Sequence, residues 1–323
     1  MMTSKETVRR AIARTGPGRL PLLFGVTHQE KSDILGEMFH PADSFHPPQA
    51  NIDEWGIEWE SLDQTLGQPK NTPLASWDML SSYAAPDPNA AGRYDHLRAF
   101  VGRNADKYLM ATLGISGFNR TMYIRGYENT MEDLYLNRDR IEQLLDMVFS
   151  FETEVIKNYG RFGIDAVSFF DDWGMQESLM ISPELWREMF KPRYRRQFDL
   201  AHRLGMHVYF HCCGNIYSII GDLVEIGADV LNLNQPDLLG IERMGKDFGG
   251  RVCFNCPVDH QRLALDGSRD EIFSYVKRLY ENLGCFNGGF IGLIEDYRFM
   301  GQKDESYENI VEAFECLNKE RHS

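Results

Sequence analysis

The chain has 323 residues, of which 43% are apolar and 25% charged, a balance typical of a globular protein that buries a large core. Its formal net charge of −14 excludes general nucleic-acid binding, which needs a basic surface. No stretch approaches the roughly 18 uninterrupted apolar residues of a membrane-spanning helix, and the N-terminus lacks the apolar segment of a signal peptide. We therefore expect a cytoplasmic protein that binds neither nucleic acid nor membrane.

The organisation along the chain indicates one domain spanning residues 1–323. The sequence has no internal repeat and no low-complexity linker. Residues 40–75 are rich in Pro, Asn and Asp and predict an irregular excursion, with a short β-ribbon at residues 54–61. Excursions of this kind often cover an active site, so we expect this one near the mouth of the fold.

The rest of the chain alternates between short β-rich runs and amphipathic helical segments. The predicted strands lie at residues 20–26, 108–116, 165–172, 207–213, 229–235, 251–257 and 288–295. The clearest helical segments lie at residues 131–163, 182–205 and 268–284. The second of these begins with Ser182 as N-cap and Pro183 at the first helical position, and Gly205 is a typical helix end.

This alternation predicts a parallel sheet with helices outside it. Seven or eight such units in a chain of this length favour an α/β fold with a single (β/α)8 barrel of the TIM type, or a distorted form of it, over an open doubly wound sheet. The first predicted strand is not followed by a G-x-G-x-x-G segment, which argues against dinucleotide binding.

Polar side chains end five consecutive predicted strands. They are Asp171, Asp172, His211, Cys213, Asn232, Asn234, Gln235, Asn255, Cys256, Glu295 and Asp296. A strand buried on both faces usually consists of Val, Ile and Leu, and the catalytic groups of α/β barrels lie at the C-terminal ends of the strands. We therefore expect these polar groups to converge on one mouth.

The run "VYFHCCGNI", residues 208–216, indicates part of a metal site. Because side chains alternate along a strand, His211 and Cys213 point the same way, whereas Cys212 points into the helix layer. Imidazole and thiolate are ligands that suit zinc. A catalytic zinc usually has three protein ligands, so the third must come from the end of another strand.

Several stretches resemble the uroporphyrinogen decarboxylase superfamily in the expected order. They lie at residues 124–146, 165–196, 207–237, 257–272 and 287–291, and the second includes "DDWGMQ". They are most similar to the superfamily's corrinoid-dependent branch, the methylcobalamin:coenzyme M methyltransferases. True uroporphyrinogen decarboxylases carry an arginine-rich N-terminal segment that binds substrate carboxylates, whereas the matching region here has Arg19 alone. The resemblance therefore favours the methyltransferase branch.

The zinc enzymes of that branch place a cysteine after the "GGFI" strand, where this chain has Asp296. A carboxylate oxygen also binds zinc. The metal ligands that the resemblance implies are His211, Cys213 and Asp296, with Glu295 and Cys256 as alternatives for the third.

In those methyltransferases, zinc binds the acceptor thiol and lowers its pKa, and the thiolate attacks a methyl group on cobalt. This chain has no D-x-H-x-x-G segment of the kind that corrinoid domains carry. The resemblance thus implies a partner corrinoid protein that carries methylcobalamin, and a small-molecule methyl donor or acceptor. A lyase of the uroporphyrinogen decarboxylase type, or a non-catalytic barrel that binds a tetrapyrrole or metal, are the alternative functions.

The other strand-end residues are candidates for supporting roles. Asp171 and Asp172 are a candidate acid–base pair, although only one of two adjacent strand residues can face the mouth. Gln176, Gln235 and Arg120 are candidates for binding substrate. Loop structure is the alternative for the two glutamines, and a surface salt bridge is the alternative for Arg120.

Overall fold

The computed structural model describes residues 2–60 and 67–320, and its centre is a parallel sheet of eight strands in the order β1-β10-β9-β8-β7-β6-β5-β2. The strands are β1 (Leu22–Phe24), β2 (Ile34–Met38), β5 (Tyr108–Ile115), β6 (Ala166–Phe170), β7 (His207–Cys212), β8 (Val230–Leu233), β9 (Cys253–Pro257) and β10 (Phe290–Ile294). At the ends of this order, the N–H of Asp33 donates to the carbonyl of Leu22 at 2.8 Å. The sheet is therefore a nearly closed barrel, and the predicted (β/α)8 fold is confirmed.

All seven predicted strands are present, but strand β2 was not predicted. Only the short 3-10 turn η1 (Gln29–Lys31) separates it from β1, so the usual intervening helix is missing. Its burial alternates, with Gly36 and Met38 exposed, so it lacks the continuous apolar run of a central barrel strand. The tertiary fold, rather than local β-propensity, makes this segment a strand.

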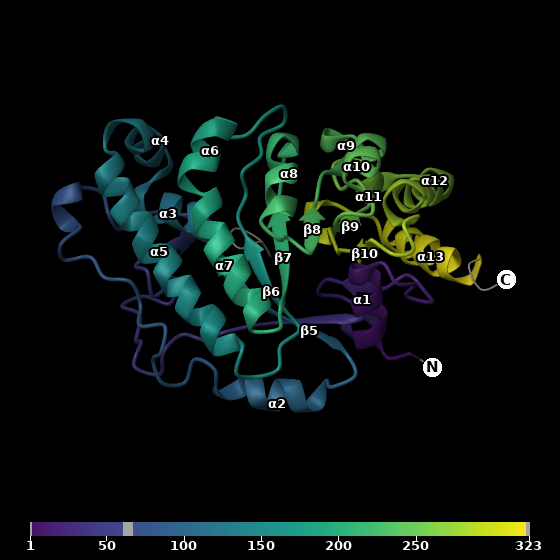
Figure 1. Ribbon diagram of the computed structural model, residues 1–323, viewed down its shortest axis with the longest axis horizontal. Helices are drawn as coiled ribbons and strands as arrows, with labels where there is room; N and C mark the ends of the chain where they lie inside the picture. The colour runs from purple at the N-terminus through teal and green to yellow at the C-terminus, as the bar shows by residue number, and fades with distance from the viewer. Residues whose placement is uncertain (1, 61–66, 321–323) are drawn as a thin grey trace.

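Helices surround the strands. They are α1 (Ser4–Ala13), α2 (Asp95–Arg103), α3 (Gly117–Arg125), α4 (Tyr127–Leu136), α5 (Arg138–Tyr159), α6 (Pro183–Met189), α7 (Lys191–Arg203), α8 (Tyr217–Glu225), α9 (Pro236–Leu239), α10 (Ile241–Phe248), α11 (Leu263–Asp266), α12 (Arg269–Leu279) and α13 (Asp304–Glu320). Figure 1 shows α5, α7 and α8 outside strands β6 and β7. No helix among the residues described has the length and apolarity needed to cross a bilayer.

Two of the predicted helical segments are each divided in the structure. Residues 131–163 contain the end of α4 and all of α5, and residues 182–205 contain α6 and α7. The second break falls just before Pro192, which has no N–H to continue α6 and instead begins α7. The predicted cap is present, since the Ser182 hydroxyl accepts from the N–H of Leu185 at 3.2 Å.

The N-terminal helix α1 closes the end of the barrel at which the strands begin, called the lower end below. Its Val8 and Ile12 belong to the inner core, together with Tyr108 and Tyr209 from the strands. Beside them, the buried carboxylate of Asp165 at the start of β6 pairs with two cations of α1. This end is therefore filled and neutralised, which makes the opposite end the candidate mouth.

The excursion at residues 40–75 packs on helix α3, which follows β5. Its short ribbon pairs β3 (Trp59–Glu60) with β4 (Gln68–Pro69), so the predicted ribbon at 54–61 supplies only the first strand. Residues 61–66 lie outside the described part. The Asp53 carboxylate joins the Arg120 guanidinium at 2.9 Å, and that guanidinium lies over the Trp55 ring.

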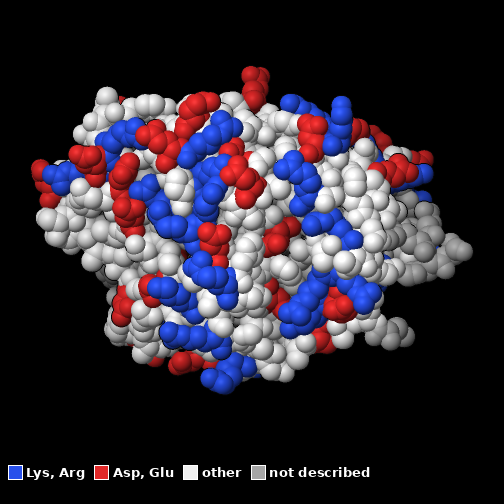
Figure 2. Space-filling view, in the orientation of Figure 1, with Lys and Arg blue, Asp and Glu red and all other residues white. Residues whose placement is uncertain are grey.

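Charges of both signs are mixed on one face of the outer surface. Figure 2 shows basic and acidic side chains intermingled over the face that carries α5, α6 and α7. On this face Lys191 contacts Asp222 at 2.7 Å and Arg195 contacts Glu225 at 2.6 Å. The face is therefore not a continuous basic patch, in spite of the many arginines in α7.

Candidate metal centre

The ends of strands β6 and β7 bring three metal-ligating groups together at the mouth. The two strands pair in parallel, with Phe170 opposite His211. The Nε2 atom of His211 lies 3.6 Å from the Sγ of Cys213 and 3.6 Å from an Oδ1 of Asp172. One ligand atom from each residue lies within 4.8 Å of the other two. These three residues are called the mouth cluster below.

Strand alternation selects these side chains. Tyr209 belongs to the inner core of the barrel, so His211 and Cys213 share its inward face. Cys212 points the other way and is buried in the outer core, the apolar cluster to which the surrounding helices contribute. Its sulfur accepts from the N–H of Trp173 at 3.1 Å. The structure thus separates one inward cysteine from one structural cysteine.

The same alternation separates the two adjacent aspartates. Asp172 lies at the mouth, and its Oδ1 accepts from the N–H of Cys213 at 2.7 Å. Asp171 is fully buried, accepts from the N–H groups of Phe118 and Asn119 at 2.9 and 2.8 Å, and contacts the hydroxyl of Tyr194. Burial raises the pKa of Asp171 well above its usual value. Asp171 therefore holds the start of helix α3, and Asp172 alone of the pair faces the mouth.

A chain of buried amides determines which nitrogen of His211 is free. The Nδ2 of Asn255 donates to the carbonyl of Ile291 at 3.0 Å, which leaves its Oδ1 to accept from the Nδ2 of Asn232 at 2.9 Å. The Oδ1 of Asn232 must then accept from the Nδ1–H of His211, at 2.6 Å. The lone pair of neutral His211 is consequently on Nε2, the atom that faces Cys213 and Asp172. Metal-binding histidines commonly donate the N–H of their other ring nitrogen to a carbonyl oxygen, as His211 does here.

The mouth cluster has an excess of acidic groups. Burial, Asp172 and Glu295 together raise the pKa of the Cys213 thiol well above its usual value. Among the described residues, no lysine or arginine forms an ion pair with Asp172 or Glu295. Imidazole nitrogen, thiolate sulfur and carboxylate oxygen are all zinc ligands, and a divalent cation would supply the missing positive charge. The residues present therefore fit a zinc ion.

The structure does not bring Asp296 into the mouth cluster. Ile291 faces the inner core, so Glu295 shares its face and Asp296 points outward. The Asp296 carboxylate accepts from the Thr27 hydroxyl at 2.6 Å and pairs with Arg298. Burial opposes the effect, but these hydrogen bonds and the arginine lower the pKa of Asp296. Its assignment as the third ligand stays a prediction, and Asp172 is the carboxylate that lies beside His211.

The two alternatives for the third ligand lie in different places. Glu295 is near enough to Cys213 to raise the pKa of its thiol, and it contacts the Tyr297 hydroxyl. Cys256 is fully buried in the outer core, and burial raises the pKa of its thiol. Cys253 belongs to the inner core instead, so the two cysteines of this C-x-x-C pair occupy opposite faces of β9.

The residues predicted to bind substrate are distributed around the mouth. The Oε1 of Gln235 accepts from the N–H of Gly214 at 2.7 Å, which links the loops after β7 and β8. Gln176 is exposed in the loop after β6. Arg120 is held by Asp53 of the excursion, as described above. All three lie on loops or helices that follow strand ends, and their roles in binding stay predictions.

The loops after β6 and β7 touch without intervening side chains. A Cβ placed at Gly214, whose φ is +74°, would come within 2.2 Å of the carbonyl oxygen of Gly174. Residues that follow these two glycines line a cavity of about 550 Å³, among them Ser178 and Asn215, together with Arg243 of α10. The cavity is large enough for a small molecule, but no residue of the mouth cluster lines it.

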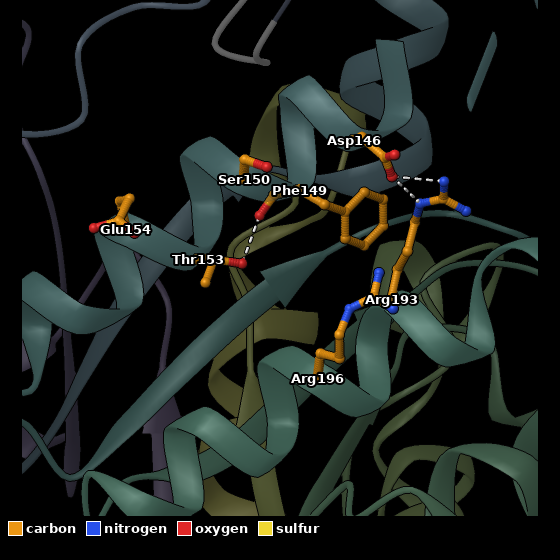
Figure 3. A pocket seen from close by; sticks show the side chains of 7 residues that line it. All are labelled: Asp146, Phe149, Ser150, Thr153, Glu154, Arg193 and Arg196. Atoms are coloured by element: carbon orange, nitrogen blue, oxygen red, sulfur yellow. Dashed lines mark hydrogen bonds and ion pairs between the residues drawn. The ribbon is translucent and has the colours of Figure 1, made fainter. Parts of the chain in front are cut away.

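A second cavity, of about 440 Å³, lies between helices α5 and α7 on the outside of the barrel. Figure 3 shows Asp146 of α5 bound to Arg193 of α7, with Arg196 beside them. Arg193 is buried and also donates to the carbonyl of Met189. None of the strand-end residues lines this cavity, so its ion pair joins two helices and is not part of the mouth.

Sequence reasoning predicted His211 and Cys213 as metal ligands, and the structure brings them together. Their binding of a metal stays a prediction. The same reasoning grouped Asp172 with the acid–base candidates instead of the metal ligands. Asp172 comes two residues after Phe170, so the two side chains share a face, and Phe170 is opposite His211 in the parallel register. That register is the signal that would have placed Asp172 beside His211. The role of the Asn232–Asn255 pair was also missed. It depends on the register between three strands, which the sequence of one strand does not contain.

The fold and the mouth cluster define an α/β barrel protein with a candidate metal centre at the C-terminal ends of its strands. The chain belongs to the uroporphyrinogen decarboxylase (URO-D) family, because the family model of that description matches residues 56–291, well over half of its length. No curated protein sequence matches the chain at a significant level.

Two solved structures show how far the likeness of fold extends. A methyltransferase from Methanosarcina mazei is 13% identical and superposes with a TM-score of 0.74, covering 98% of this chain and 99% of its own. A 3-keto-D-glucoside 4-epimerase from E. coli is 12% identical with a TM-score of 0.43, covering 70% of this chain and 85% of its own. At these identities the first likeness supports the fold over the whole chain.

Proposed function

We propose that this member of the URO-D family is a zinc-dependent methyltransferase that moves a methyl group between a corrinoid protein and a thiol or other small acceptor. The observation that carries the proposal is the convergence of His211 Nε2, Cys213 Sγ and Asp172 Oδ1 at the mouth of the barrel. The full-length likeness of fold to the methyltransferase from Methanosarcina mazei supports the same class.

A zinc ion at this position would hold an acceptor thiol as the thiolate, the form that attacks a methyl group. The residues of the chain orient the site for that chemistry. Asn232 keeps the lone pair of His211 on Nε2, and the N–H of Cys213 fixes the Asp172 carboxylate beside it. The Phe170 ring stacks on His211 with centroids 4.3 Å apart and shields one face of the imidazole from water.

We propose Asp172 as the third ligand, with Glu295 facing the same space from β10. A carboxylate in place of a second thiolate makes the donor set harder, so the site would discriminate less strongly for zinc against other first-row metals. Asp172→Ala should release the metal, and Asp296→Ala should leave it bound, as measured by elemental analysis of the purified variants. The opposite pattern would restore Asp296 as the ligand.

The rim of the mouth suits a partner with an apolar surface. Large apolar side chains at or after the C-terminal ends of β1, β6 and β10 are exposed, although such residues are usually buried. They are Val26, Phe170, Met175, Phe299 and Met300. A methylcobalamin carried by a corrinoid protein would have to approach the mouth cluster over this rim, so we propose the rim as the docking surface.

A decarboxylase acting on a polycarboxylate needs several free cations. Arg19, the only arginine in the segment that matches the substrate-binding one, pairs with the buried Asp33 at the seam between β1 and β2. Arg19 is therefore already paired and is not a free cation for a substrate carboxylate.

The proposal is tested by mixing the zinc-loaded protein with free methylcobalamin and a small thiol and following the loss of the methyl group from cobalt. Wild type should demethylate the cofactor in a thiol-dependent way, and Cys213→Ser should not. Turnover of uroporphyrinogen, with no metal bound even after zinc is added, would replace the proposal by the decarboxylase reading.

A further inference from the structure

A second group of metal-ligating residues lies outside the barrel, at the end of β2. Glu37 of β2, His40 just after it and His96 of α2 offer one ligand atom each within 4.8 Å of one another. Glu37 makes its ion pair, among the described residues, with His96 alone, and its Oε1 lies 3.9 Å from Nε2 of that ring. The three residues are called the β2 cluster below, and they share no residue with the mouth cluster.

The tautomer of His96 leaves one nitrogen without a partner. Its Nε2 lies 2.9 Å from the carbonyl oxygen of Met38, so Nε2 carries the hydrogen and donates it. In the neutral ring, Nδ1 then carries a lone pair. This Nδ1 is buried and has no hydrogen-bond partner among the described residues. Buried polar atoms are nearly always satisfied, and a carbonyl on one nitrogen with the other nitrogen free is the arrangement of a metal-binding histidine.

The position of His40 is fixed at its backbone and open at its side chain. Its N–H donates to the carbonyl of Arg93 at 2.9 Å, and its carbonyl accepts from the guanidinium of the same buried arginine at 3.1 Å. The imidazole is exposed and stacks on that of His96, with centroids 3.6 Å apart and planes 5° apart. A ligating imidazole has the metal in its own plane, so His40 must rotate about its side-chain bonds before both rings can bind one ion. Its exposure permits that rotation.

We propose that Glu37, His40 and His96 form a second site for a divalent transition-metal ion such as Zn²⁺. Two imidazole nitrogens and a carboxylate oxygen are a donor set that zinc accepts, with water in the fourth position. The bound ion would join the first residue of the excursion to strand β2 and helix α2. Because His40 has to rotate, and because the Glu37 carboxylate has to turn from Nε2 of His96 toward Nδ1, we expect this site to bind zinc at least tenfold more weakly than the mouth cluster.

The experiment titrates Zn²⁺ calorimetrically into the metal-free full-length chain and its variants. Wild type should take up two equivalents, and Cys213→Ser only the weaker one. The double variants Cys213→Ser/His96→Ala and Cys213→Ser/His40→Ala should take up none. Cys213→Ser/His46→Ala, which removes an exposed histidine outside both clusters, is the matched control and should still bind one equivalent.

Two spectroscopic readouts separate this inference from the proposed function. Co²⁺ bound to Cys213→Ser should lack the thiolate-to-cobalt charge-transfer band that the wild type shows. The Nδ1 resonance of His96 should shift on addition of Zn²⁺, while its Nε2–H stays bonded. The inference is overturned if Cys213→Ser binds no zinc, or if removing His40 and His96 leaves its binding unchanged. A wild type whose single equivalent disappears in Cys213→Ser would overturn it while leaving the proposed function intact.

Discussion

The two ends of the barrel differ in whether their acidic side chains are paired with cations. At the lower end, Asp165 is bound by Lys5 at 3.0 Å, by Arg9 at 2.7 Å and by the N–H of Leu109 at 2.9 Å. At the mouth, Asp172 and Glu295 lie near Cys213 with no lysine or arginine paired to either among the described residues. An acidic side chain that is paired with cations stabilises the fold, whereas neighbouring acidic side chains without a paired cation form a site that can bind a cation.

Replacing the inward cysteine, Cys213, should have the largest effect on metal binding. Cys213→Ser should abolish tight binding of the metal and change the free energy of unfolding of the metal-free protein by less than about 1 kcal/mol, because open catalytic sites contribute little to folding. Elemental analysis and urea unfolding measure the two effects. Cys285→Ser, which alters an exposed cysteine, is the control and should keep the metal. Retention by Cys213→Ser of the tight equivalent, the one that a competing chelator does not remove from the wild type, would refute the assignment.

Removing an acid at each end should have contrasting effects on stability. Asp165→Ala should lower the free energy of unfolding by about 3 kcal/mol, because it leaves two cations and a buried N–H without their partner. Asp172→Ala should lower that of the metal-free protein by less than about 1 kcal/mol, because its side chain is 42% exposed. The measurement is urea unfolding with chelator present. Equal losses at the two ends would remove the distinction drawn between them.

Glu152, a buried acid of helix α5, should give the protein a pH-dependent stability. Burial raises the pKa of Glu152 from 4.5 to about 7, although Gln197 and the N–H of Gly117 both donate to it. The folded state therefore holds this proton more tightly than the unfolded state. The stabilisation is complete below pH 4.5 and is lost as the pH rises through about 7.

The contribution of Glu152 to the free energy of unfolding should fall by about 2 kcal/mol between pH 5 and pH 8. Glu152→Gln should remove that part of the slope, because the amide does not ionise. The side-chain oxygen of Gln197 is buried without a partner, so rotation of this amide can provide an acceptor for the new Nε2. Urea unfolding of both proteins at the two pH values makes the comparison, and parallel slopes would contradict the prediction.

A further expected effect concerns the orientation of the His211 ring. Asn232→Ala should weaken metal binding roughly ten- to a hundredfold, because His211 loses the acceptor that keeps its lone pair on Nε2. Asn232→Asp retains that acceptor and should recover most of the affinity, which a purely structural role for the amide would not explain. Competition with a chromophoric chelator measures both constants.

The sequence by itself determined the class of fold and two members of the mouth cluster. Alternation of strands and helices requires a parallel sheet covered by helices, and side-chain alternation within one strand is a local property of the backbone. That property is sufficient to put His211 and Cys213 on one face and Cys212 on the other. It also limits Asp171 and Asp172 to opposite faces, without saying which of them faces inward.

Only the tertiary structure decided the rest. Strand β2 exists because the barrel has to be closed, and its short, partly exposed sequence does not predict it. Asp171 is turned away from the mouth because helix α3 and Tyr194 bind it from outside, which presents Asp172 to His211. The tautomer of His211 depends on a register that runs through Asn232 and Asn255 on two further strands. These features depend on contacts between distant segments, whose alignment is set by packing rather than by any local pattern in the chain.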